Sequence, residues 1–79
     1  MTAAQSWRIG EIRNELAAWK GHRSPTYRAA ADPFTVEQIR DAASRLDRMT
    51  FDDDAEQAGA VIGAWHKGGL PAVMGIFVK

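Results

Sequence analysis

The sequence predicts a mainly α fold, a small domain of three helices over about residues 6–20, 35–49 and 51–67 with an apolar segment at 70–79. Apolar residues recur at steps of three and four in each helical stretch, which places them on one face of a helix. Residues typical of turns and helix ends separate the stretches. A chain of 79 residues is expected to form one domain, residues 1–79.

The first predicted helix ends at Gly21, a residue type common just after helices. Its apolar face consists of Ile9, Ile12, Leu16 and Trp19. Trp7 falls on the opposite side of the helical wheel. Three placements stay open for it: within the capping segment, folded back, or exposed where it could contact a partner.

Residues 22–33 form the main loop, in which residues 27–31 could make a single helical turn. Pro25 and Pro33 bracket the loop, and each disfavours helix at the preceding residue. Long loops in small domains often carry function. The candidate contact residues here are Arg23, Tyr27 and Arg28.

The second predicted helix has a well-defined start. Thr35 is a good N-cap, and Gln38 three residues later completes the pattern of a capping box. Its apolar face contains Val36, Ile39, Ala43 and Leu46. On the polar face, Asp41 and Arg45 are spaced i,i+4 and are expected to form an ion pair.

The third predicted helix starts within residues 50–54 and stops at Gly68–Gly69. Either Thr50 or one of the following aspartates caps it. The acidic cluster comprises Asp52, Asp53, Asp54 and Glu56, and carboxylates are favoured at a helix N-terminus. We interpret the cluster mainly as a helix start. An acidic contact patch is the alternative, whereas a metal site is disfavoured because the alternating ligands and central glycine of an EF-hand are missing.

Gly59 and Gly63 lie four residues apart inside this helix, in line with Ala55. A glycine inside a helix costs about 1 kcal/mol relative to alanine, so some gain should offset the two. Small residues at this spacing form a shallow strip that another backbone can approach closely. We favour a tight crossing with another helix of the same chain. The alternative is a docking strip for a partner or a second copy.

The C-terminal segment, residues 70–79, is almost wholly apolar. Its branched and aromatic residues favour an extended strand, although Pro71 also suits the first turn of a short fourth helix. We favour the strand, which needs a partner for its amides. Residues 26–29 are a weak candidate for that partner. Otherwise the segment lies along the helices or pairs with a second copy, which would make a homodimer.

No arrangement of residues predicts catalysis or cofactor binding. The chain has no cysteine, its serines fit no nucleophile motif, and His22 and His66 are better explained as loop and helix-end residues. We therefore expect no enzymatic activity, no cofactor and no metal.

Charge and composition indicate where the protein acts and what kind of organism it comes from. Ten basic and ten acidic residues give a net charge of zero, with the basic residues concentrated in residues 8–28 and the acidic ones in residues 47–56. No stretch is apolar enough to cross a membrane, and residues 1–6 do not resemble a signal peptide. The absence of cysteine fits a cytoplasmic location. Abundant alanine, and arginine in excess of lysine, suggest a bacterial or bacteriophage source.

These features favour a small non-enzymatic protein–protein interaction module, such as an inhibitor or adaptor that masks a host complex. The candidate contact residues are Asp52, Asp53, Asp54, Glu56, Arg23, Tyr27, Arg28, Gly59 and Gly63. The alternative is a small nucleic-acid-binding regulator that uses the basic N-terminal helix and loop. A helix-turn-helix docking is disfavoured, because it would place the three aspartates against phosphates.

Overall fold

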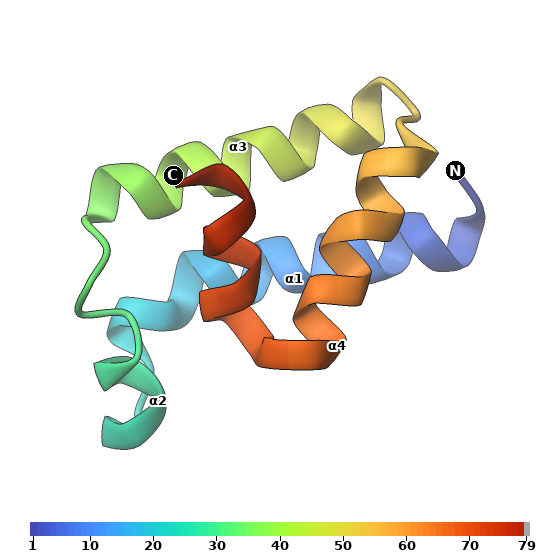
Figure 1. Cartoon of the computed structure of the whole chain (residues 1–79). Coiled ribbons are helices and arrows are strands. Elements are labelled where there is room, and N and C mark those ends of the chain that lie inside the picture. Colours follow the sequence, from blue (N-terminus) through green and yellow to red (C-terminus); the bar gives the residue numbers. More distant parts are fainter. Residues whose placement is uncertain (79) are drawn as a thin grey trace.

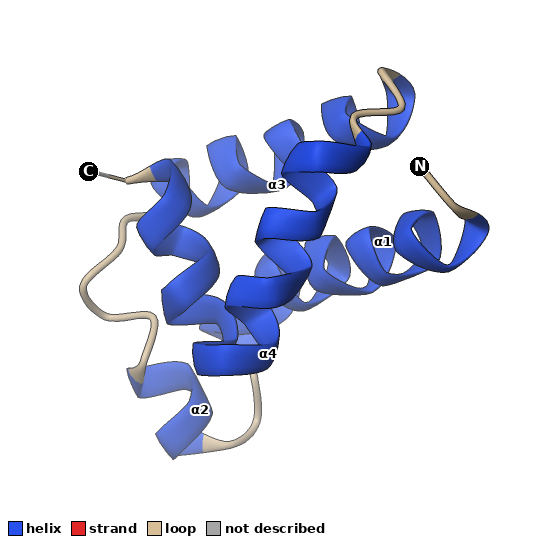
Figure 2. Ribbon diagram, turned by 45° about the vertical axis from the view of Figure 1, so that its right-hand side comes forward, coloured by secondary structure: helices blue, strands red, loops and turns tan. Residues whose placement is uncertain are grey.

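The computed structural model describes residues 1–78, which fold into helices joined by short connections (Figures 1 and 2). In chain order these are α1 (Ala3–Ala18), a 3₁₀ turn η1 (Trp19–Gly21), α2 (Pro25–Ala29), α3 (Val36–Phe51) and α4 (Ala55–Phe77). The described residues contain no strand. The predicted mainly α fold is confirmed.

Helices α1 and α3 lie side by side in opposite directions, and α4 packs across both of them (Figures 1 and 2). One cluster of apolar side chains fills the space between the three helices. Its largest fully buried members are Trp19, Ile9, Ile12, Leu16, Leu46, Leu70, Met74, Val61 and Val73. Every apolar residue predicted for the core face of the first helix is among them.

Helix α1 starts three residues earlier than predicted, because Thr2 caps it. The Thr2 hydroxyl accepts a hydrogen bond from the Gln5 amide at 3.1 Å, and the Gln5 side chain accepts one from the Thr2 amide at 2.9 Å. This capping box satisfies two amides that the helix start would leave unpaired. The same box at Thr35 and Gln38 starts α3, as the sequence predicts.

The connection between α3 and α4, residues 52–54, lies later in the chain than predicted. Helix α3 continues through Phe51, so Thr50 lies inside it and does not cap α4. Asp54 is the cap instead, since its carboxylate accepts a hydrogen bond from the Gln57 amide at 3.2 Å. The predicted pair of Asp41 and Arg45 is present on the exposed side of α3, with a distance of 3.0 Å between its nitrogen and oxygen.

The favoured strand in the C-terminal segment is wrong, because residues 70–77 are helical. Gly69 has φ 68° and ψ −155°, which breaks α4 at the predicted glycine stop, and a second helical part follows (Figure 1). Leu70, Val73 and Met74 are buried at helical spacing, and the helix satisfies its own amides without a partner strand. Pro71 occupies the first turn, where its missing N–H costs nothing. Residue 79 lies outside the described residues.

The loop after α1 is fixed to the core through Trp19. This side chain is 0 % exposed, and its indole N–H donates a hydrogen bond to the Tyr27 carbonyl oxygen at 2.8 Å. The ring centroids of Trp19 and Phe34 are 5.8 Å apart. Residues 26–29, the candidate strand partner, belong to the short helix α2, which Ser24 caps. The strand pairing is therefore wrong on both sides.

Candidate functional site

The acidic cluster lies at the turn between α3 and α4, and its carboxylates have different roles. Asp54 caps α4 through the Gln57 amide. Asp53, in a left-handed conformation with φ 56°, pairs with the amino group of Met1 at 2.5 Å. The side chains of Asp52 and Glu56 are exposed and form no ion pair within residues 1–78. Two of the four carboxylates are thus used within the fold, and two are free for a partner.

The outer face of α4, formed by Glu56, Gly59, Ala60, Gly63 and Lys67, is exposed to solvent. A Cβ atom built on Gly59 or Gly63 would meet no atom within 4 Å. The favoured crossing with another helix of the same chain is therefore wrong for the described residues. Helix α4 buries its opposite side, with Ala58 and Val61, against α1 and α3.

The loop residues predicted to contact a partner are partly used inside the fold. The Tyr27 hydroxyl donates a hydrogen bond to Glu15 at 2.7 Å. Burial, followed by this bond and the charge of Glu15, raises the pKa of the Tyr27 phenol. Arg28 donates to the carbonyl oxygen of His22 at 2.9 Å and is otherwise exposed. Arg23 is exposed and precedes α2 by two residues.

The predicted contact residues fall into two groups at different places. The acidic cluster and the glycine strip adjoin each other along the start of α4. The other group belongs to α2, which contains Tyr27 and Arg28, and to the turn before it, which contains Arg23 (Figure 1). In Figure 1 the α3–α4 turn is at the upper right and α2 at the lower left, and the molecule measures 34 Å along its longest axis. The two groups therefore do not form one continuous patch.

A groove between α1 and α3, which the sequence did not predict, has a volume of about 400 Å³. We call it the α1/α3 groove. The buried residues of its lining are the apolar Leu16, Ile39 and Ala43, which we call its floor, whereas the charged residues are exposed or half-buried and are called its edges. The lining residues are Arg13, Leu16, Ala17, Lys20, Val36, Ile39, Arg40, Ala43, Ser44 and Asp47.

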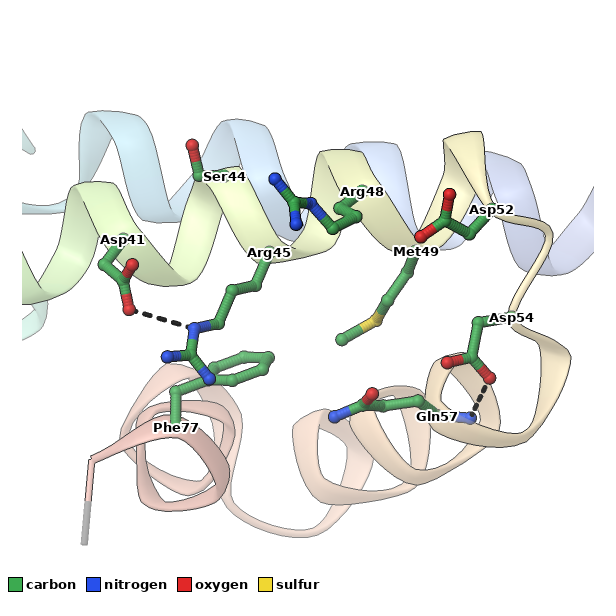
Figure 3. A pocket seen from close by; sticks show the side chains of 9 residues that line it. All are labelled: Asp41, Ser44, Arg45, Arg48, Met49, Asp52, Asp54, Gln57 and Phe77. Atoms are coloured by element: carbon green, nitrogen blue, oxygen red, sulfur yellow. Dashed lines mark hydrogen bonds and ion pairs between the residues drawn. The ribbon is translucent and has the colours of Figure 1, made fainter.

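A second groove, of about 560 Å³, lies between α3 and the two parts of α4 (Figure 3). Its charges are largely balanced from within. Arg45 pairs with Asp41, and its guanidinium carbon lies 5.9 Å from the centroid of the Phe77 ring. Asp54 is engaged with the Gln57 amide, and the side chain of Met49 reaches into the groove (Figure 3). Arg48 is the one basic side chain of this groove without an ion pair in residues 1–78.

Trp7 is exposed, which is one of the three placements that the sequence leaves open. It is 64 % exposed, and the Arg8 guanidinium carbon lies 5.2 Å from its ring centroid and 5.4 Å from that of Trp65. Arg8 also pairs with Glu11 at 2.6 Å. The positive charge next to Trp7 is thus already balanced by a neighbouring carboxylate.

Within residues 1–78, no three potential metal-ligating side chains come together, and no helix has the length and apolar character needed to span a bilayer. Comparison with protein-family models, with curated proteins and with solved structures gave no match.

Proposed function

We propose that this chain is a small non-enzymatic protein-interaction module that docks a partner on the outer face of α4. The observation that carries the proposal is the open space beside Gly59 and Gly63. Each glycine costs about 1 kcal/mol relative to alanine, and no described residue of the chain gains packing from its missing side chain. A partner backbone lying against the strip would give both glycines a packing role.

Charges at the two ends of this face define what the partner must offer. Glu56 lies at its start and Lys67 near its end, and both are exposed without an ion pair in the described chain. Asp52, in the connection between α3 and α4, adds a further free carboxylate. A complementary partner surface is therefore basic where it meets the α3–α4 turn and acidic near Lys67.

By covering such a basic surface, the chain would act as an inhibitor or adaptor that masks a larger complex. A basic surface of this kind is also what binds nucleic-acid phosphates, which the carboxylates would imitate. A bacterial or bacteriophage source and a cytoplasmic place of action belong to the same proposal and rest on composition.

The test is affinity capture from bacterial lysate with three forms of the chain, before and after nuclease treatment. The double variant Gly59→Leu/Gly63→Leu places two large side chains on the strip. Gly75→Leu is the matched control, because Gly75 is also exposed on α4 and a Cβ there also meets no atom within 4 Å.

We expect a stoichiometric protein partner that survives nuclease, that the control retains, and that the double variant loses. Retention by the double variant would remove the outer face of α4 as the site. Loss of all captured proteins after nuclease would instead favour nucleic-acid binding by the basic N-terminal half.

The contribution of the free carboxylates is tested by Asp52→Lys/Glu56→Lys. Asp53 and Asp54 are left intact, since they hold the Met1 amino group and cap α4. Unchanged capture of the partner by this variant would rule out the imitation of phosphates.

A further inference from the structure

We propose that the α1/α3 groove is a second docking surface, and that its ligand is an acidic amphipathic helix of another protein. This groove is formed by α1, the following turn η1 and α3, with no residue of α4 among those that line it. It therefore does not depend on the outer face of α4, and each surface can be tested without the other.

The floor of the groove is apolar and incompletely covered. Leu16 and Ile39 are buried at its base, while Val36 is 48 % exposed. Ala17 and Ala43, one from each helix, are small and leave room in the middle of the groove. Aliphatic side chains of a ligand would cover Val36 and remove its apolar surface from water.

The edges of the groove carry an excess of positive charge. They hold three cations, Arg13, Lys20 and Arg40, against the single carboxylate of Asp47. Arg40 is exposed and has no ion pair among residues 1–78. A ligand with carboxylates along its flanks is complementary to this edge.

The other two cations also keep capacity for a ligand. Arg13 reaches Asp47 at 3.4 Å and the Asn14 side chain at 3.5 Å, and both contacts are long. Lys20 donates one hydrogen bond to the Ala31 carbonyl oxygen at 3.1 Å, which leaves two of the three donors on its ammonium group.

The shape of the groove favours a helix. It follows two antiparallel helices, so a third helix laid along it would pack on both through residues at i, i+3, i+4 and i+7. Arg13 of α1 and Lys20 of η1 are seven residues apart, about 10.5 Å at the rise of an α-helix, which is two turns of an opposing helix. Nucleic acid fits less well, because the floor is apolar and Asp47 repels phosphate.

The probe is an acetylated and amidated 16-residue peptide with leucines at helical i, i+3, i+4 and i+7 positions and glutamates along both flanks. Its control carries lysine at every glutamate position. Both are titrated into the ¹⁵N-labelled full chain, and amide shifts are followed by NMR.

We expect the glutamate peptide to bind at least tenfold more tightly than the lysine peptide, with the largest shifts at Ala17, Val36 and Ala43. Equal affinities, shifts centred elsewhere, or dissociation constants weaker than about 1 mM for the glutamate peptide would overturn the proposal.

Two charge reversals on α3 show whether the peptide binds in the groove or responds only to the net charge of the chain. Arg40→Glu should weaken binding of the glutamate peptide at least tenfold. Arg48→Glu, on the same helix but outside the groove, is exposed and likewise without an ion pair in the described chain, and it should have little effect. Equal losses from both reversals would contradict docking in the groove.

Duplex DNA is titrated in parallel at two salt concentrations. Binding of DNA that is tighter than binding of the glutamate peptide and that depends on Arg40 would replace the helix with a phosphate ligand and overturn the proposal.

Discussion

At the scale of single residues, replacing the glycines of α4 by alanine should have opposite effects on stability at different positions. Alanine at position 59 or 63 meets open space in a helical conformation. We expect Gly59→Ala and Gly63→Ala each to raise the free energy of unfolding by about 0.5–1 kcal/mol, because alanine loses less backbone freedom in a helix. Urea denaturation followed by circular dichroism measures this.

The control positions lie farther along the same helix. A Cβ on Gly68 would come within 2.9 Å of the Ala72 Cβ, and Gly69 has a positive φ that alanine disfavours. Gly68→Ala should therefore bring no gain, and Gly69→Ala a loss of about 1–3 kcal/mol. A loss of stability in Gly59→Ala or Gly63→Ala would mean that the outer face of α4 is not open in solution.

The second residue-scale prediction concerns the hydrogen bond from Tyr27 to Glu15. Tyr27→Phe should lower the free energy of unfolding by about 1–2 kcal/mol near neutral pH, because the acceptor is a carboxylate. The folded state raises the pKa of the phenol, so the unfolded chain ionises first as pH rises. The stabilisation is complete below the ordinary pKa, near 10, and declines at higher pH.

Urea denaturation of the wild type and of Tyr27→Phe between pH 8 and 11 shows in which direction the stabilisation changes with pH. The difference between wild type and Tyr27→Phe should be constant up to about pH 9 and shrink above pH 10. A difference that grows with pH would show that the phenol is not held in its neutral form.

At the scale of elements, the second part of α4 should be essential to the core. Met74 is fully buried, and truncating a buried methionine leaves a cavity. We expect Met74→Ala to lower the free energy of unfolding by about 2–4 kcal/mol. The exposed Pro71→Ala should change stability far less. A loss below about 1 kcal/mol for Met74→Ala would place this segment outside the core.

Local patterns in the sequence identified most of the elements. The capping box at Thr35 and Gln38 predicts the start of α3, and the same pattern at Thr2 and Gln5 marks the start of α1, three residues before the predicted one. In the C-terminal segment the β-branched residues favour a strand, whereas the spacing of Leu70, Val73 and Met74 favours the helix that forms. That spacing, with no credible strand partner, was the evidence for helix.

The candidate surfaces were harder to predict than the helices. Spacing identified the strip at Gly59 and Gly63, but which side of α4 faces the core depends on packing against α1 and α3. The α1/α3 groove could not be predicted at all. Its residues come from positions 13–20 and 36–47, and only the antiparallel arrangement of the two helices brings them together.

At the scale of the whole molecule, a single apolar cluster joins α1, α3 and both parts of α4. We therefore expect one cooperative unfolding transition. In the variant Trp7→Phe/Trp65→Phe, the fully buried Trp19 is the only tryptophan and reports on the core. Its fluorescence and the far-ultraviolet circular dichroism should give the same urea midpoint. Separate midpoints would show that one helix unfolds independently.

The break at Gly69 has a consequence for chirality. Inverting the signs of its φ and ψ gives the polyproline II conformation of an ordinary L residue, so the backbone there has the geometry of a D residue. Gly69→D-Ala, introduced by chemical synthesis of the chain, should relieve the backbone strain that L-alanine imposes and restrict the unfolded chain. The two mirror-image methyl groups should thus shift the melting temperature in opposite directions, upward for D and downward for L.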